Sequence, residues 1–474
     1  MNPIELVERL GRWSSGRGPL YVLLAGGLRQ LIDEGELPSG TLLPPDRTLA
    51  KHLTVGRSTV VAAYELLMTE GRIVRRQGSG TRVAGDAPTP AREVTSTPFL
   101  LHLLDSHEDV IQLACATPET APREIIAAYE RAMERLFAGA PDMGYHPYGH
   151  PYLRACIADR YRKRGVPTEP EQIIVTTGGQ QALSLLARSL LKPGLHALVE
   201  APTYPGALEV FRDEGAVLHT LPVGLPDLAS AARRTEFALA YLIPTYQNPT
   251  GAVLPALMRR RLVEEATAAG IPLIEDEVLA DLRFPGEETP PPLAAFCDSV
   301  ISVGSLSKVL WGGLRTGWIR APIAQINRLA RLRAVHELGG NVPAQLAAGE
   351  LLTELDRLND RAAPIRERRH DHLCAELARL IPEWEITPVR GGQSIWVRIP
   401  HGTGASFVQA ALRQRVTALA GNGLDASGGS HEYLRLQFMA APEVLTEAVQ
   451  RLAAAWESYR PPREITGTPP VMAV

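Results

Sequence analysis

One lysine in the second half of the chain, Lys308, is the residue that most clearly indicates chemistry. The 474-residue sequence has 49 basic residues, and its only lysines are Lys51, Lys163, Lys192 and Lys308. Because arginine serves almost wherever a positive charge suffices, a retained lysine indicates a role that a guanidinium cannot fill. A primary amine can lose its proton and attack a carbonyl to form a Schiff base, whereas arginine stays protonated. From the count alone, an ordinary surface lysine remains the alternative.

Lys308 follows the last of five short runs that read as β-strands separated by helical patterns. The predicted strands are 172–176, 197–200, 238–243, 271–274 and 300–303. Strands that alternate with helices are typical of an α/β domain with a mostly parallel sheet. Such sheets bind ligands at the carboxyl ends of their strands. The residues that follow each strand are therefore the candidates for a site.

The residues after the first three strands could hold an anion, a flat ring and an oxygen atom. Gly179 and Gln180 stand in a Gly-rich turn from strand to helix, where backbone N–H groups can hold a phosphate. Tyr204 follows the second strand and offers an aromatic ring, while Asn248 follows the third and can hydrogen-bond a phenolate oxygen. Taken singly, each has a structural alternative as an ordinary turn residue or a core tyrosine.

The last two strands add a carboxylate, hydroxyl groups and the amine. Asp276 follows the fourth strand, and a carboxylate at a buried strand end needs a cationic partner, such as a protonated pyridine nitrogen. The fifth strand leads to Ser305, Ser307 and Lys308, and Arg315 follows seven residues later. Together the five strand ends supply the groups that pyridoxal 5′-phosphate requires.

From Tyr145 to Arg435 the sequence resembles the fold-type-I aminotransferases, and this resemblance implies a role for each candidate. Lys308 would form the Schiff base with the cofactor, and Asp276 would keep the pyridine nitrogen protonated, which makes the ring an electron sink. The other implied contacts are Asn248 at the ring hydroxyl, Tyr204 against the ring face and, at the phosphate, Gly179, Gln180, Ser305, Ser307 and Arg315.

The same resemblance assigns the two residues at its ends. Tyr145 matches a tyrosine that reaches the phosphate in the partner subunit, and Arg435 matches the arginine that binds an amino acid's α-carboxylate through two hydrogen bonds. A structural arginine on a strand is the alternative for Arg435. The sequence departs from the family at one point. A tyrosine usually follows two or three residues after the aspartate that matches Asp276, but Val278 and Leu279 occupy these positions here. Cofactor binding is still expected, whereas efficient transamination is left open.

The first 83 residues form a separate pattern of three helices and a β-hairpin. Leucines at helical spacing between positions 20 and 31 predict the first helix, and the third begins at Arg57. Short β-runs at 73–75 and 81–83 flank a Gly-rich turn. This order predicts a helix-turn-helix with a wing, in which the second helix of the pair enters the DNA major groove.

Over residues 19–83 this pattern resembles the GntR-type winged helix. The matching sequence motifs include Leu43-Pro44-Pro45-Asp46-Arg47, Arg57-Ser58-Thr59-Val60 and Arg76-Gln77-Gly78-Ser79-Gly80-Thr81. Arginine can pair with guanine edges and hydroxyl groups with phosphates. The resemblance therefore implies DNA contacts from Arg47, Arg57, Ser58, Thr59 and the wing tip at Gly78. Gly56 replaces the usual Ser or Thr N-cap, which should change stability only slightly.

The net charge of −3 by itself argues against nucleic-acid binding, but the distribution of charge along the chain favours it. Residues 1–84 contain 11 basic and 8 acidic residues, while the remainder contains 38 and 44. A basic small domain on an acidic large one is typical of local nucleic-acid contact, although a solvated charged face is the alternative. No apolar run could span a bilayer and the N-terminus is not a secretory signal, so we expect a cytoplasmic protein. The four cysteines are far apart, suit a reducing compartment and give no metal site.

The expected organisation has three parts. Residues 1–83 form the winged helix-turn-helix domain, 84–110 a Pro-rich linker, and 111–474 an α/β domain with a smaller C-terminal α+β subdomain. This organisation resembles the MocR-type bacterial transcription regulators over essentially the whole chain. The resemblance implies a head-to-tail homodimer that binds double-stranded operator DNA and senses an amine or amino-acid effector through the Schiff base of Lys308.

Two other functions remain open. An active aminotransferase that also binds DNA is supported by the retained Lys308, Asp276 and Arg435, while Leu279 counts against it. A cofactor-free dimerisation scaffold is disfavoured by the complete set of cofactor residues. The sequence does not identify the effector, the target genes, the spacing of the DNA half-sites, or whether the protein activates or represses.

Overall fold

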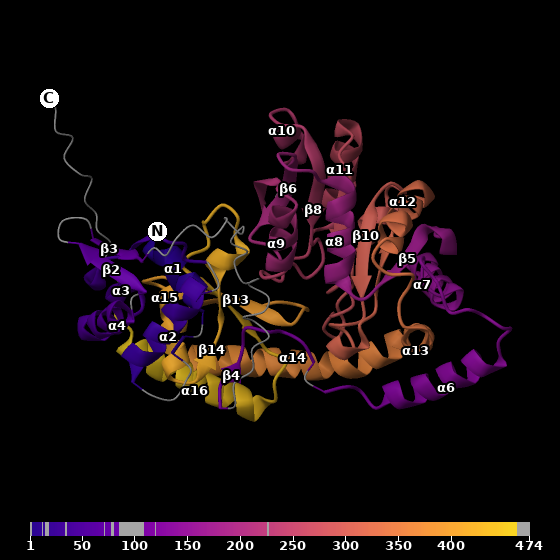
Figure 1. Ribbon diagram of the computed structural model, residues 1–474. Coiled ribbons are helices and arrows are strands. Elements are labelled where there is room, and N and C mark those ends of the chain that lie inside the picture. The colour runs from indigo at the N-terminus through magenta and orange to yellow at the C-terminus, as the bar shows by residue number, and fades with distance from the viewer. Residues whose placement is uncertain are drawn as a thin grey trace.

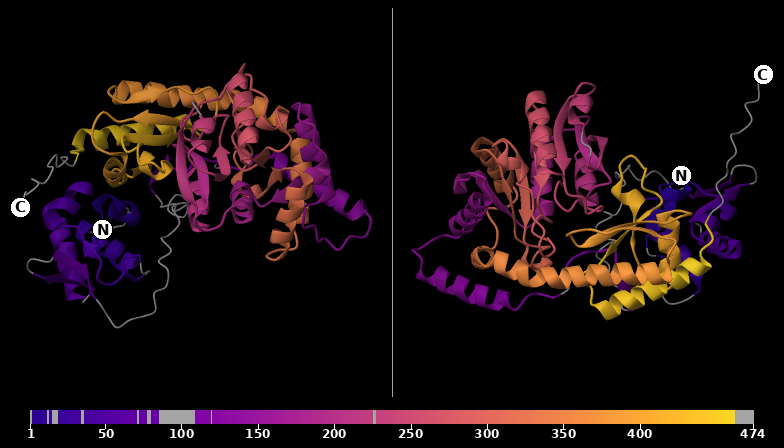
Figure 2. Two further views of the ribbon diagram at one scale, coloured as in Figure 1. Left: turned by 90° about the horizontal axis from the view of Figure 1, so that it is seen from above. Right: turned by 180° about the vertical axis from the view of Figure 1, so that it is seen from behind.

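The computed structural model describes residues 2–11, 13–14, 19–33, 36–70, 72–76, 80–84, 109–118, 120–224 and 227–461. Within these residues the chain forms an N-terminal helical domain, a large α/β domain and a smaller C-terminal subdomain (Figure 1). Helix α14 (Leu355–Leu380) runs from the large domain along the subdomain. The N-terminal domain lies against the subdomain, as the two further views in Figure 2 also show.

The N-terminal domain has the predicted winged helix-turn-helix fold. Its strands pair antiparallel in the order β1-β3-β2. Helix α1 was not predicted; Pro3 stands in its first turn, and the Asn2 side chain caps it by accepting a hydrogen bond from the Ile4 N–H at 3.0 Å. The elements are α1 (Pro3–Leu10), α2 (Leu20–Asp33), β1 (Leu42–Leu43), α3 (Asp46–His52), α4 (Arg57–Thr69), β2 (Ile73–Arg76) and β3 (Gly80–Val83).

The large domain is built on a seven-stranded sheet in the order β5-β11-β10-β9-β8-β6-β7. Only β11 pairs antiparallel with its neighbours in this sheet, so the predicted mostly parallel sheet is confirmed. The five predicted strands are present with small shifts of their ends, and β7 and β11 were missed. The strands are β5 (Ile173–Thr176), β6 (His196–Ala201), β7 (Val217–Pro222), β8 (Phe237–Leu242), β9 (Leu273–Asp276), β10 (Ile301–Ser305) and β11 (Gly317–Arg320).

Helices cover both faces of this sheet. Helices α8, α9 and α12 bury apolar side chains against one face, and α7, α11 and α13 bury theirs against the other. This two-sided burial explains why the strands are almost continuously apolar. The helices are α6 (Glu124–Ala138), α7 (Pro151–Lys163), α8 (Gly179–Leu190), α9 (Pro205–Asp213), α10 (Leu228–Ala232), α11 (Ala256–Ala269), α12 (Ile323–Ala334) and α13 (Val342–Thr353).

The C-terminal subdomain is the expected α+β unit. Its sheet has the order β12-β13-β16-β15, and β14 pairs in parallel with β4. Strand β4 precedes the large domain in the sequence, so residues on both sides of the large domain build the subdomain. Besides α14, its elements are β4 (Ile111–Gln112), β12 (Glu385–Thr387), β13 (Ser394–Arg398), α15 (Gly404–Arg413), β14 (Val416–Thr417), β15 (Leu419–Ala420), the 3₁₀ turn η4 (Gly421–Leu424), β16 (Tyr433–Gln437) and α16 (Pro442–Ser458).

No helix within the described ranges has both the length and the apolar character that a membrane crossing requires.

Candidate ligand site and DNA-binding surface

A cavity of about 500 Å³ lies at the carboxyl ends of the large-domain strands. Its walls come from the turns after β5, β6, β8, β9 and β10, from residues 115–117, and from the subdomain sheet. This size is typical of a small-molecule site. Ten of the eleven residues predicted around the cofactor and its ligand line it: Gly179, Gln180, Tyr204, Asn248, Asp276, Ser305, Ser307, Lys308, Arg315 and Arg435.

The amine of Lys308 lies inside this cavity. Its Nζ donates a hydrogen bond to the backbone carbonyl of Ala116 at 2.8 Å. Burial lowers the pKa of the Lys308 amine, and the nearby Arg435 cation acts in the same direction, while Cys115 opposes the change. A lysine with a lowered pKa is more often uncharged, which is the form that can attack a carbonyl.

Asp276 is the last residue of β9, and two hydrogen bonds fix its carboxylate. The Tyr241 hydroxyl donates to Oδ2 at 2.7 Å, and the Val278 N–H donates to Oδ1 at 2.9 Å. Burial nevertheless raises the pKa of Asp276 to about 6. A cation beside this carboxylate would restore its charged form. Tyr241 was missed in the sequence analysis because it lies inside a strand, and its strand neighbours give no signal for a role in a site.

The turn between β5 and α8 brings backbone N–H groups and hydroxyls together. Gly178 has a φ of 124° and precedes the first turn of α8. A Cβ atom at Gly317 would lie only 2.8 Å from the Gly178 backbone, so β11 can pass here only with glycine. Nearby, the Ser305 hydroxyl donates to the Ser307 hydroxyl at 3.1 Å, and the exposed Arg315 guanidinium lies over Gly178. This is an arrangement that can hold a phosphate.

Tyr204 is oriented from the same turn. Its hydroxyl donates to Gln180 Oε1 at 3.0 Å, and Gln180 Nε2 donates to the Gly206 carbonyl at 3.0 Å. The side chain of Gln180, which was predicted only as a phosphate contact, therefore also orients Tyr204. A fixed aromatic ring at the cavity wall can stack on a flat ligand.

Arg435 crosses the cavity from β16 to the segment that follows β4. Its Nη1 donates to Asn248 Oδ1 at 2.9 Å, and its Nη2 donates to the Ala114 carbonyl. Burial lowers the pKa of Arg435 to about 10. Its Nε, and also Gln393 Oε1 in the same wall, are buried without hydrogen-bond partners among the described residues. A buried guanidinium with an unused donor fits a carboxylate ligand.

The cavity residues therefore fit pyridoxal 5′-phosphate with a bound amino compound. Asp276 needs a cation, the turn before α8 can take an anion, and Arg435 can take a second anion. Gln393 and residues 114–117 were missed in the sequence analysis, because no motif marks them.

Two further features from the sequence analysis supply no polar contact in this cavity. Val278 and Leu279, at the usual tyrosine position, line the cavity with apolar side chains and offer no hydroxyl to a ring oxygen. Tyr145 is 65% exposed and does not line the cavity of its own chain. A role for Tyr145 at the cofactor would therefore require a second subunit.

The predicted DNA-contacting side chains lie at one end of the helix-turn-helix. Arg57 and Ser58 are exposed in the first turn of α4, Thr59 is partly exposed, and Arg47 is exposed on α3. Arg57 Nε donates to Asp46 Oδ2 at 3.1 Å. Gly78 lies outside the described residues, as does most of the predicted linker.

Comparison with known proteins agrees with both parts of the chain. Residues 108–452 match the family model for aminotransferase class I and II, and residues 20–83 match the model for bacterial regulatory proteins of the gntR family. YisV of Bacillus subtilis, an uncharacterised HTH-type transcriptional regulator, is 30% identical over 90% of this chain and 94% of its own. PdxR of Corynebacterium glutamicum, an HTH-type pyridoxine biosynthesis transcriptional regulator, is 32% identical over 77% of this chain and 80% of its own.

A solved structure gives the same fold for the large domain and subdomain. The α-aminoadipate aminotransferase LysN of Thermus thermophilus, complexed with N-(5′-phosphopyridoxyl)-L-leucine, superposes with a TM-score of 0.69 at 30% identity, covering 76% of this chain and 94% of LysN. The chain therefore belongs to the aminotransferase class I and II family, with pyridoxal 5′-phosphate as cofactor, and within it to the MocR-type transcriptional regulators, which carry a GntR-type winged helix.

Proposed function

We propose that this regulator binds operator DNA and senses an amine or amino acid at Lys308. The observation that carries the proposal is a shared contact. Lys308 Nζ and Arg435 Nη2 both donate to carbonyls of one short segment, Ala116 and Ala114. That segment continues directly from β4, which the predicted linker joins to the DNA-binding domain. A ligand that binds the lysine or the arginine would therefore alter contacts of the segment that connects the cofactor cavity to the linker and the DNA-binding domain.

We propose roles for the cavity residues that follow their positions. Asp276 would bind the protonated pyridine nitrogen, and Asn248 the ring hydroxyl. Tyr204, held by Gln180, would stack on the ring. The phosphate would be held by the first turn of α8 and the neighbouring side chains: Gly179, Gln180, Ser305, Ser307 and Arg315.

When bound, pyridoxal 5′-phosphate supplies an aldehyde carbon that primary amines attack. Lys308 is the chain's own amine for this bond, and its lowered pKa keeps it reactive. A ligand amine would compete with Lys308, and Arg435 would bind the carboxylate of an amino acid. Ligand binding shifts a conformational equilibrium only by its difference in affinity for the two states. Here that difference in affinity would arise because the ligand replaces the hydrogen bonds of Lys308 and Arg435 to the backbone carbonyls.

We further propose that the protein acts as a head-to-tail homodimer. The exposed Tyr145 would then reach the phosphate site of the partner subunit. A two-fold dimer places two winged helices on two DNA half-sites. On the DNA, Arg47, Arg57, Ser58 and Thr59 would form the contacts at the major groove, and Gly78 would form the wing tip. The proposed boundaries are 1–83, 84–110 and 111–474.

The test compares DNA binding with and without amines in cofactor-loaded protein. DNA selected from a random-sequence library would be titrated with the protein, and binding would be followed by fluorescence anisotropy. The titration would be repeated in the presence of each compound of a panel of amines and amino acids. We expect at least one compound to change the Kd, and Lys308→Ala to bind DNA normally without that response. Lys192→Ala, which removes an exposed lysine, should respond like the unchanged protein. If no amine that alters the cofactor's absorption spectrum alters DNA affinity, the sensing proposal is wrong.

An active aminotransferase is the second candidate. The cavity retains Lys308, Asp276 and Arg435 in one place, and LysN has the same fold and bears that activity in its name. Sustained production of a keto acid from an amino donor would support this candidate. A spectral change that stops after one equivalent would favour the sensor.

A further inference from the structure

The N-terminal domain is held on the subdomain by two side chains of α15. Gln409 Nε2 donates to the Gly11 carbonyl at 2.8 Å, and Arg413 Nη1 donates to the Leu53 carbonyl at 3.1 Å. Residues four apart lie on one face of a helix. Gly11 and Leu53 are the C-cap residues that directly follow α1 and α3, where carbonyls lack partners within the helix. One face of α15 therefore supplies donors to two helix ends of the DNA-binding domain.

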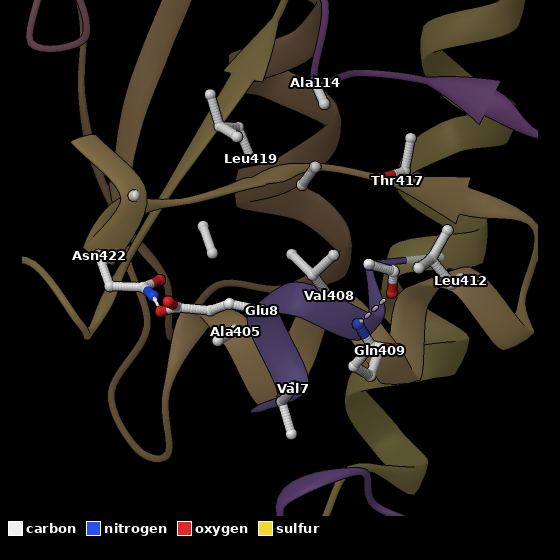
Figure 3. Close-up of a pocket in the computed structure, with 14 residues that line it drawn as sticks. Val7, Glu8, Ala114, Ala405, Val408, Gln409, Leu412, Thr417, Leu419 and Asn422 are labelled. Atoms are coloured by element: carbon white, nitrogen blue, oxygen red, sulfur yellow. Dashed lines mark hydrogen bonds between the residues drawn. The ribbon is translucent and has the colours of Figure 1, made fainter. Parts of the chain in front are cut away.

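A cavity of about 130 Å³ lies between α1 and α15 (Figure 3). Val7 comes from α1, Val408 and Leu412 come from α15, and Leu419 lines the space from β15. The middle of the cavity is therefore apolar. Since a cavity of roughly 150 Å³ can hold a benzene-sized molecule, there is room for about six non-hydrogen atoms.

The side-chain amides and the carboxylate at the cavity's ends offer hydrogen-bond acceptors. Gln409 is 4% exposed, and its Oε1 has no partner among the described residues, since its Nε2 is used on Gly11. Asn422 Oδ1 is likewise buried without a partner in the described ranges, since its Nδ2 donates to Glu8. Glu8 and Asn422 meet at one end of the cavity in Figure 3. An occupant with an N–H donor could therefore hydrogen-bond one of these oxygens.

Glu8 is exposed at the edge of this cavity, and its carboxylate makes no ion pair with the arginines near it. The neighbouring Arg9 pairs with Glu5 at 2.6 Å, one turn earlier on α1, and within the described ranges no ion pair includes Glu8. Desolvation, followed by the repulsion of Glu5, raises the pKa of Glu8, and the nearby cations Arg212 and Arg9 partly oppose this change. An ammonium ion at this position would form the direct ion pair that neither Arg9 nor Arg212 makes with Glu8.

This cavity and the cofactor cavity share one stretch of chain. Ala114 lines the cavity at α1, while Cys115, Ala116 and Thr117 line the cofactor cavity. The Ala114 carbonyl also accepts the hydrogen bond from Arg435. An occupant of either cavity therefore contacts the same short segment.

We propose that the cavity between α1 and α15 is a second small-molecule site, which binds a short apolar ammonium ion. Its cation lies against Glu8 and Asn422 Oδ1, and its hydrocarbon part fills the space between Val7, Val408 and Leu419. Because the DNA-binding domain forms one wall, an occupant stabilises the arrangement in which this domain rests on the subdomain. This site is additional to the effector site at Lys308.

Protonated N,N-dimethylethylamine is a suitable test molecule. It has five non-hydrogen atoms and one N–H donor, and as a tertiary amine it cannot form a Schiff base with the cofactor. Isothermal titration calorimetry on the full-length, cofactor-loaded protein should detect one bound molecule per chain. Glu8→Gln keeps an acceptor for Asn422 but removes the charge, and should weaken binding at least about tenfold. Glu65→Gln, an equal charge change at an exposed position of α4 outside the cavity, should leave the Kd unchanged.

Two further variants separate this site from the cofactor cavity. Val408→Phe fills the cavity and should abolish binding, while Lys308→Ala should bind the tertiary amine like the unchanged protein. The proposal is overturned if the unchanged protein does not bind the amine, if Glu8→Gln and Val408→Phe both bind it as the unchanged protein does, or if Lys308→Ala loses binding. A failure in this experiment leaves the effector proposal untouched, because only primary amines can compete with Lys308.

Discussion

At the scale of single residues, the cofactor cavity contains charges that burial opposes. The pKa of Asp276 is raised to about 6, that of Arg435 is lowered to about 10, and that of Lys308 is also lowered, each chiefly by burial. A cationic ring nitrogen beside Asp276 and a carboxylate beside Arg435 would reverse the first two shifts. The cavity is therefore electrostatically matched to an occupant whose charges are opposite to its own.

Tyr241 is predicted to support the cofactor through Asp276. Its hydrogen bond stabilises the carboxylate, so Tyr241→Phe should raise the pKa of Asp276 further and weaken pyridoxal 5′-phosphate binding about tenfold at neutral pH. The pH dependence of cofactor binding, measured by absorption, should move to higher pH. Tyr161→Phe is the matched control, because it removes a 2.6 Å bond to the buried Glu277, which does not line the cavity. Equal losses in both variants would contradict a specific role for Tyr241.

The raised pKa of Asp276 also predicts how stability depends on pH. Without cofactor, the folded state holds this proton more tightly than the unfolded chain, whose Asp pKa is near 3.8. The resulting contribution to the free energy of unfolding is present below about pH 4 and is lost as the pH rises through about 6. It amounts to at most about 3 kcal/mol. Asp276→Asn should therefore be more stable than the unchanged protein at pH 7 without cofactor. Urea denaturation at pH 4 and 7 checks this, and an unchanged pH dependence in the variant would contradict it.

At the scale of elements, the first turn of α4 is predicted to read DNA sequence. Arg57→Ala should weaken binding to the preferred site by roughly 1–3 kcal/mol and relax the preference for one base pair. Arg29→Ala is a control of equal charge, since Arg29 pairs with Glu70 beyond the other end of α4. Anisotropy titrations with the preferred site and its single-base variants give both quantities. A loss that is equal for all sequences would make Arg57 a phosphate contact only.

The same scale explains what the sequence could and could not predict. The strands that carry Asp276 and Ser305 are apolar and continuous, so their class was readable, although each ends two residues later than predicted. Strand β11 was missed because its four residues include Gly317 and the buried Arg320, which bonds backbone carbonyls such as that of Asp298 at 2.8 Å. Helix α1 was missed because its eight residues are too few for a clear apolar period. Contacts such as Tyr241 with Asp276 depend on the lateral order of strands, which local pattern does not encode.

At the scale of the whole molecule, the contact between the DNA-binding domain and the subdomain is predicted to transmit the effector response. Arg413 donates to the Leu53 carbonyl at 3.1 Å and to Thr54 Oγ1 at 2.8 Å, just before α4, the helix proposed to enter DNA. A cation at the end of α3 also interacts favourably with the helix dipole. Arg413→Ala should release the domain, increase the radius of gyration measured by small-angle X-ray scattering, and increase hydrogen exchange in α3.

The same variant should uncouple DNA binding from the effector. The cofactor spectrum should still respond to the amine, because Arg413 lies outside the cofactor cavity, but the amine should change the DNA Kd less than it does in the unchanged protein. Arg415→Ala is the matched control, since Arg415 is on the same segment and pairs with Asp109 at 3.1 Å on the surface. If Arg413→Ala keeps the full change in Kd, the signal does not pass through α15. A path through the linker or the partner subunit would then have to connect Lys308 with α4.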